Sequence, residues 1–418
     1  MSAENTGRKT SAVRTAIILV TALFFIWGLT MNLVNGIRDP FATYLQLSGA
    51  ESSLLQVAYF GAYFVMAIPA TMVAKRHGYK GGMIVGLVFF VLGAALTIPA
   101  TSTLSYWIFL IAMFVIALGA AALEANCNPY MTKIGGESTA STRMNIAQGF
   151  NGIGQVIGPL LLGLILGETV TAGDPGFQEA RDTFMGQTAL IYTVIGIVVL
   201  AVLLVFVFAK LPTPAGDDVG MANSARFGAV FFRPYFTFGV VALFVYVGLQ
   251  TLGFSVFSTF AQQQWDGINA GVASTLLAVL TVLFALGRFA TAPVFKYVES
   301  GKVLAIYFSA GFAMMFLAAL GLGPISVIAF MVLYFFMSIG FPTIYALALR
   351  GIDGAAAKNG AAILTMTIGG GAVIPLLLGF VQDAFGLEAS LFVSLIGFAY
   401  LVWYGISGSR IGYHQKVS

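Results

Sequence analysis

Long apolar stretches, separated by short polar connections, follow one another along almost the whole chain. A bilayer core about 30 Å thick is crossed by roughly 20 apolar residues in a helix. On this scale we predict twelve membrane-spanning segments, at residues 15–38, 52–74, 81–100, 104–131, 143–167, 184–209, 233–260, 270–296, 301–321, 324–349, 358–382 and 388–408. They are expected to be helices because lipid cannot satisfy free backbone groups, whereas a barrel shows short segments of alternating polarity.

The longest polar interruption in the middle of the chain is residues 210–228, which carry the prolines, glycines and charges of a linker. It divides the predicted segments six and six, as in transporters made of two six-helix halves. We therefore predict an all-α integral membrane fold with an N-terminal six-helix bundle (1–210), a linker (211–228) and a C-terminal six-helix bundle (229–418).

An internal repeat supports the two halves. The run Pro159-Leu-Leu-Leu-Gly163 recurs as Pro375-Leu-Leu-Leu-Gly379, at an offset of 375 − 159 = 216 residues. The same offset pairs Gly154 with Gly370. Both copies lie in the fifth predicted helix of their half, which is the position that a duplicated bundle predicts.

Composition narrows the class of protein. Hydrophobic residues make up 59% of the 418 positions and charged residues only 9%, whereas soluble domains carry about 25% charged residues. A soluble enzyme, a disordered chain and a nucleic-acid binder are thereby excluded. One cysteine and two histidines leave no metal cluster, and no Ser/His/Asp set or phosphate-binding loop can be assembled, so neither an enzyme nor a cofactor is predicted.

The placement of basic residues predicts the orientation. With the N-terminus inside, 17 of the 20 lysines and arginines fall on the inner side of the membrane. Cytoplasmic loops carry such an excess, so both termini are expected to be cytoplasmic.

Polar residues within the predicted helices are the candidate functional groups, because each is costly in hydrocarbon. They occur on three helices of the first half: Asn32, Asn35 and Asp39 with Arg38 beside them; Glu124, Asn126 and Asn128; and Gln148, Asn151 and Gln155. The last three share one helical face. The polar residues of these three helices are interpreted as hydrogen-bonding groups for a substrate. For Gln148, Asn151 and Gln155, helix–helix contacts are the alternative. For Glu124 the alternative is a structural carboxylate satisfied by neighbouring amides.

The polar lining is not repeated in the second half. At the 216-residue offset Glu124 corresponds to Gly340 and Asn151 to Thr367. Ion coupling and most substrate hydrogen bonds are therefore assigned to the N-terminal half. The second half offers Tyr246 and Gln250, which can share a face with aromatic side chains suited to stacking on a sugar. In so aromatic a chain, however, packing is the more common reason for such stripes.

Three further charged residues lie at or within helices. Arg38 and Asp39 form either a salt bridge at the outer end of the first helix or a gating pair. Arg288 is predicted to be a gate or loop anchor rather than a ligand contact.

Four segments carry a resemblance to a known family: FFIWGLTMNLVNGIRDPF, AKRHGYKGG, ALEANCNPYMTKIG and RMNIAQGFNGIGQVIGP. They resemble the fucose–galactose–gluconate:proton symporters, the bacterial fucose-permease branch of the major facilitator superfamily. The resemblance implies a twelve-helix fold in the bacterial inner membrane, a monomer, and import of a hexose or deoxyhexose by proton symport. It also implies that Glu124 and Asn151 lie at the sugar site.

The first helix departs from the family pattern, which commonly has an Asn-Asp pair there. Counted from Trp27 the aspartate position holds Asn35, and counted back from Pro40 it holds Gly36. Two mechanisms stay open. In the first, Glu124 carries the proton, with Asp39 as a possible substitute. In the second, the coupling differs from that of the family: Glu124 and the amide oxygens hold sodium, or the protein is a uniporter. The alternatives from another functional class are an exporter of amphipathic compounds and a membrane sensor. The amides disfavour an exporter, and the lack of a signalling domain disfavours a sensor.

Overall fold

The computed structural model describes residues 3–47, 49–166, 170, 173–214 and 226–413. The described part of the chain consists of helices and their connections, without strands. The α-helices are α1 (Ala3–Tyr44), α2 (Gly49–Ser102), α3 (Tyr106–Lys133), α4 (Ala140–Leu166), α5 (Phe177–Phe208), α6 (Pro234–Gln264), α7 (Ala270–Thr291), α8 (Ser300–Ala319), α9 (Pro324–Met337), α10 (Gly340–Ala348), α11 (Gly354–Met366), α12 (Gly370–Phe385) and α13 (Leu387–Trp403).

These thirteen helices account for the twelve predicted segments. Helix α2 carries two of them and bends at Gly78, whose φ of 72° only glycine adopts without strain. Helices α9 and α10 together form one segment, as do α11 and α12. Ten segments of the described chain are long and apolar enough to cross a membrane, with the two limbs of α2 counted once and α4 not among the ten.

The chain divides into two compact units. Of the described residues, unit 1 contains those up to 127 and 153–213, and unit 2 contains 128–152, 214 and those from 226 onward. The end of α3 and the start of α4 therefore group with the second half of the sequence. The division into bundles at 1–210 and 229–418 stays a prediction. Residues 215–225 of the predicted linker lie outside the described residues.

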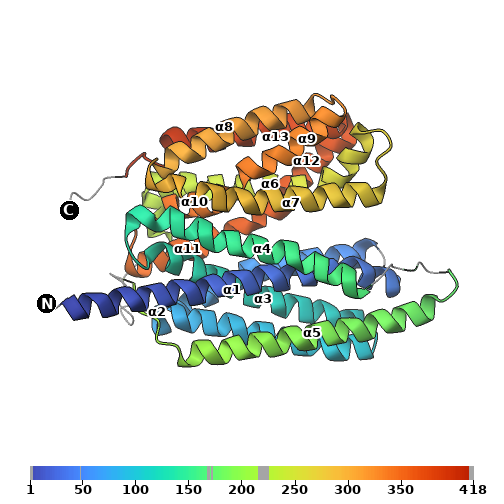
Figure 1. The fold of residues 1–418 in the computed structure, drawn as a ribbon, viewed down its shortest axis with the longest axis horizontal. Helices are drawn as coiled ribbons and strands as arrows, with labels where there is room; N and C mark the ends of the chain where they lie inside the picture. Colours follow the sequence, from blue (N-terminus) through green and yellow to red (C-terminus); the bar gives the residue numbers. More distant parts are fainter. Residues whose placement is uncertain (1–2, 48, 167–169, 171–172, 215–225, 414–418) are drawn as a thin grey trace. The chain divides into compact units, whose positions relative to one another are not determined.

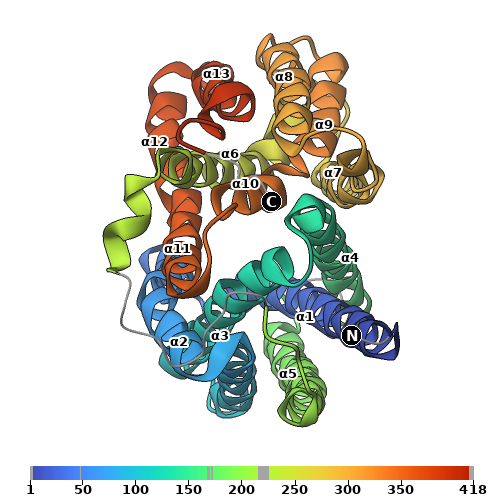
Figure 2. The same ribbon diagram turned by 90° about the vertical axis from the view of Figure 1, so that its left-hand side faces the viewer.

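Within unit 2, α8 packs against both α9 and α13, and α12 packs against α6 (Figure 1 and Figure 2). Within unit 1, α5 packs against α2. These contacts bury one side of each helix and leave apolar side chains exposed on the other, such as Leu190 and Ile197 on α5. An exposed apolar face suits a helix in lipid.

The internal repeat has the same role in both copies. A side chain at Gly154 would clash with the backbone of α1 around Gly28, and one at Gly370 would clash with the backbone of α6 at Phe244. The contacted stretch of α1, residues 25–29, corresponds at the same offset to residues 241–245 of α6, which include Phe244. In each half a glycine of the fifth helix thus lets it cross the first helix at backbone contact, as small residues do in membrane proteins.

Candidate functional site

The acidic residue Glu124 lies on α3 within unit 1 and is 5% exposed. Tyr63, on α2, lies close enough to interact with its carboxyl group. Tyr59 and Cys127 interact with the carboxyl electrostatically. Tyrosine hydroxyls and a cysteine thiol are ordinarily neutral at pH 7.

Tyr59 and Tyr63 were not singled out from the sequence. They lie one turn apart on α2, and their hydroxyl oxygens are 3.3 Å from each other. Among 16 tyrosines in an apolar chain, their only sequence signal is a four-residue spacing that packing produces equally often. Their relation to Glu124 depends on how α2 lies against α3, which the sequence does not specify.

Three of the predicted amides belong to unit 2. Gln148 and Asn128 are buried, and the Gln148 side chain donates a hydrogen bond to the Asn128 amide oxygen at 3.4 Å. Asn151 is also buried. The structure thus brings Asn128 of α3 and Gln148 of α4 together in unit 2.

The predicted residues Asn32 of α1 and Gln155 of α4 belong to unit 1. Asn32 is half-buried and donates to the carbonyl of Gly28 at 3.1 Å. Gln155, on α4, is half-buried in unit 1. The side chains of Asn35, Arg38 and Asp39 lie outside the described part of the structure, so the predicted Arg38–Asp39 pair stays a prediction.

The aromatic surface predicted for the second half is packed into the bundle. Tyr246 is fully buried, and its hydroxyl donates to the Met337 carbonyl at 2.9 Å. Gln250 is half-buried, and its backbone carbonyl accepts from Tyr334 at 2.7 Å. Tyr334 in turn contacts the ring of Phe254 at 4.6 Å between centroids. The Tyr246 hydroxyl is therefore used to hold α6 against α9.

Arg288 on α7 connects three helices of unit 2. It is 3% exposed and donates to the carbonyls of Ser338 at 3.0 Å and Gln148 at 2.5 Å. Its guanidinium lies 4.4 Å from the Phe284 ring centroid. Ser338 follows the last residue of α9, where a carbonyl lacks its helical partner. Arg288 therefore supplies that partner and joins α7 to the end of α9 and to the interior of α4.

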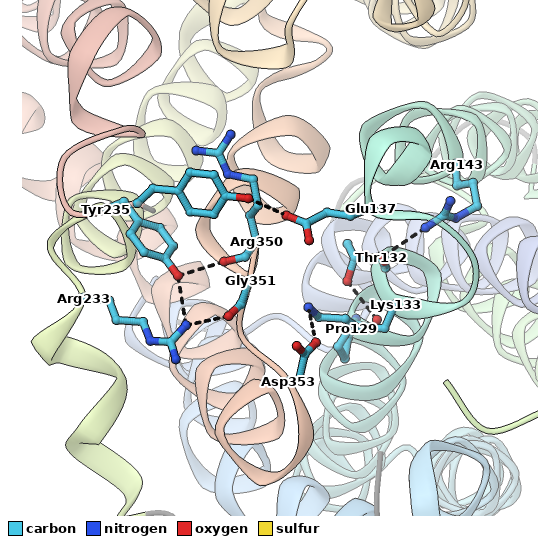
Figure 3. A network of polar contacts seen from close by, with 11 residues as sticks. Pro129, Thr132, Lys133, Glu137, Arg143, Arg233, Tyr235, Arg350, Gly351 and Asp353 are labelled. Atoms are coloured by element: carbon cyan, nitrogen blue, oxygen red, sulfur yellow. Dashed lines mark hydrogen bonds and ion pairs between the residues drawn. The ribbon is translucent and has the colours of Figure 1, made fainter. Parts of the chain in front are cut away.

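A polar network surrounds the connection between α3 and α4 (Figure 3). Lys133 pairs with Asp353 at 3.0 Å, and the Tyr413 hydroxyl donates to Glu137 at 3.1 Å. The Arg350 guanidinium lies 3.6 Å from the centroid of the Tyr413 ring. Burial and then the Glu137 carboxylate raise the pKa of Tyr413, which keeps its hydroxyl protonated as a donor.

Arg143 fixes the same connection from the start of α4. It donates to the carbonyls of Met131, Thr132 and Gly136 at 3.0, 3.0 and 2.9 Å, and also to the Thr139 hydroxyl. The first two carbonyls belong to the last turn of α3 and have no partner within that helix. Arg143 is thus the cap of α3 and shapes the connection that follows it.

The described residues contain no group of three or more His, Cys, Asp or Glu side chains that could hold a metal ion. The chemistry available to the candidate residues is therefore hydrogen bonding through amides and hydroxyls, with one buried carboxyl group in unit 1.

Comparisons with known proteins agree with the fold. The family model "Major Facilitator Superfamily" matches residues 17–375. A glucose/galactose transporter of Brucella abortus is 32% identical over 400 residues, covering 94% of each chain, and an L-fucose-proton symporter of Escherichia coli is 32% identical over 381 residues, covering 88% of this chain and 87% of its own.

The solved structures give the same picture. A crystal structure of the E. coli fucose:proton symporter superposes with a TM-score of 0.86 at 30% identity, over 97% of this chain and all of its own. A structure of such a transporter in the outward conformation has a TM-score of 0.88, with the same identity and coverage. The relatives are transporters, not enzymes. The chain belongs to the major facilitator superfamily of twelve-helix membrane transporters and, within it, to the fucose–galactose–gluconate:proton symporter family.

Proposed function

We propose that this protein imports a monosaccharide, a hexose or deoxyhexose, together with a proton by alternating access. Relatives named as glucose/galactose and L-fucose-proton transporters support the substrate class and the ion. The proposed location is the bacterial inner membrane, with both termini in the cytoplasm, as the basic residues indicate.

The observation that carries this proposal is the buried carboxyl group of Glu124. A carboxyl group in a membrane helix is expensive unless it has a function. The tyrosines near it carry hydroxyls, which can donate to a carboxylate or accept from a carboxyl group. We assign the coupled proton to Glu124, because no carboxylate occupies the family position at Asn35 or Gly36.

The sugar contacts are assigned to the amides. Asn128, Gln148 and Asn151 are buried amides of unit 2, and Asn32 and Gln155 are half-buried in unit 1. Amides both donate and accept, as sugar hydroxyls require. Asn35 and Gln250 are assigned to the same role from their positions, and Arg38, Asp39 and Arg288 to gating. Tyr246 is assigned a supporting role behind the site, because its hydroxyl bonds to Met337.

Purified protein in proteoliposomes tests the substrate and the ion separately. Counterflow of labelled glucose, galactose and L-fucose requires no ion gradient, so it identifies the sugar. An inward proton gradient and an inward sodium gradient are then imposed in turn. We expect accumulation with the proton gradient that a protonophore abolishes. Accumulation that follows sodium and ignores pH would overturn proton coupling, and counterflow without accumulation in either gradient would indicate a uniporter.

A further inference from the structure

A short 3-10 helix, η2 (Phe227–Phe232), leads from the predicted linker into α6. Figure 2 shows it in yellow-green beside α6 and α11, and it contacts both of them. Side chains three residues apart eclipse one another in such a helix. Val230 is buried, so its face is turned toward the bundle, whereas Phe232 lies on another face and is 89% exposed. Because Phe231 is exposed as well, the helix presents two neighbouring aromatic rings outward.

The backbone of η2 is held at both ends. At its start, the side chain of Asn359 on α11 donates to the carbonyl of Arg226 at 3.5 Å. At its end, the Thr237 hydroxyl on α6 donates to the carbonyl of Phe231 at 2.9 Å. The outward aromatic rings therefore belong to an element that is fixed against α6 and α11.

The chain places Phe232 at the edge of the membrane. Helix α6 begins at Pro234, is apolar from its first turn, and is one of the segments that are long and apolar enough to cross a bilayer. Two residues reach at most about 7 Å, and the polar layer on each side of the hydrocarbon core is about 5–8 Å thick. An apolar ring exposed at this level meets lipid headgroups and the upper part of the acyl chains.

A basic residue at the start of η2 fits the same surroundings. Arg226 is exposed, and in the proposed orientation this end of α6 lies on the cytoplasmic side of the membrane. The cytoplasmic leaflet carries anionic lipids, which attract basic side chains near its surface. Apolar rings together with basic residues are typical of helices that lie in the plane of a membrane interface.

We infer that η2 is a membrane-interface anchor, in which Phe231 and Phe232 insert into the lipid surface where α6 enters the bilayer. The partner of this face is the bilayer itself. The anchor joins the end of the predicted linker to the membrane and fixes the level at which α6 begins. Which leaflet it enters follows from the proposed orientation, whereas the insertion of the rings does not depend on the proposed transport function.

Spin-label electron paramagnetic resonance tests this contact on the full-length protein in liposomes of phosphatidylethanolamine and phosphatidylglycerol, without sugar. Cys127 is the single cysteine of the chain and is replaced by alanine, so that a nitroxide is attached only to Phe232→Cys. Collisions with oxygen, which concentrates in hydrocarbon, are compared with collisions with a water-soluble nickel chelate. We expect collisions with the chelate to be at least about threefold less frequent than at a water-exposed position, because a polar solute is excluded from apolar surroundings.

The matched control is Ser138→Cys, which labels an exposed polar residue of another 3-10 helix, η1 (Glu137–Thr139). Both short helices lie near the connection between α10 and α11, through the bonds Lys133–Asp353 and Arg233–Gly351. Ser138→Cys therefore reports water on the same side of unit 2. Leu190→Cys, on the exposed apolar face of α5, gives the reference for a label in lipid.

Two results would overturn the inference. Collisions with the chelate as frequent in Phe232→Cys as in Ser138→Cys would place the ring in water. Rare collisions with both oxygen and the chelate would place it under protein, either another part of this chain or a second copy. If Phe232→Cys does not fold, Ala229→Cys is measured instead, because Ala229 is exposed three residues earlier on the same face. The same results in that variant support or overturn the anchor.

Discussion

Two polar regions of the structure use their acidic groups in different ways. In unit 1, the buried Glu124 lies near the hydroxyl groups of Tyr63 and Tyr59. In unit 2, the network around the α3–α4 connection joins opposite charges, as in Lys133 and Asp353. A fixed countercharge favours one protonation state of a carboxyl group, whereas a hydroxyl bonds to both. The first arrangement suits a group that exchanges a proton, and the second suits a connection that holds its shape.

The largest effect in the second region is expected at Arg143. Arg143→Gln leaves buried carbonyls at Met131 and Thr132 without their donor. We expect the free energy of unfolding to fall by about 3 kcal/mol, since each buried unsatisfied group costs about 1–3 kcal/mol. The midpoint of thermal unfolding in detergent measures this loss.

The control for this variant is Arg76→Gln, which removes the same charge from an exposed side chain for which the described structure gives no hydrogen bond. Its midpoint should stay close to that of the wild type. Equal unfolding midpoints for the two variants would contradict the capping role of Arg143. They would also show that Arg143 is not the main stabilising contact of the network.

A much smaller effect is expected at the ion pair of Lys133 and Asp353. The two side chains are 13% and 53% exposed, so solvent screens their attraction. A double-mutant cycle with Lys133→Met and Asp353→Asn should give a coupling free energy below about 1 kcal/mol. Thermal unfolding at low and high salt measures it, and the coupling should decrease as salt rises. A coupling of several kcal/mol, insensitive to salt, would show that this region depends on its charges far more than exposure implies.

Much of the fold could be predicted from the sequence because lipid imposes a simple pattern on it. The apolar segments located the twelve spans, and the offset of 216 residues located the equivalent glycines Gly154 and Gly370. At Gly78 the backbone leaves the helical conformation, so the two limbs of α2 correspond to the two predicted spans. The breaks that divide α9 from α10 and α11 from α12 were not predicted, because they depend on tertiary contacts such as the bond from Arg288 to Ser338.

The candidate site was less accessible to sequence reasoning. Glu124 was conspicuous because a carboxyl group is rare in an apolar helix, whereas Tyr59 and Tyr63 were hidden among many aromatic residues. Tyr246 shared a helical face with Gln250, as predicted, but periodicity does not show what a face contacts. In the structure its hydroxyl bonds to Met337 inside the bundle.

Whether Glu124 carries the coupled proton is tested by sugar transport in Glu124→Gln, which replaces the carboxyl group with a neutral amide of the same shape. In proteoliposomes we expect it to retain counterflow, because the amide resembles the protonated side chain, and to lose accumulation driven by a proton gradient. Accumulation at the wild-type level that remains sensitive to a protonophore would contradict the assignment of the coupled proton to Glu124.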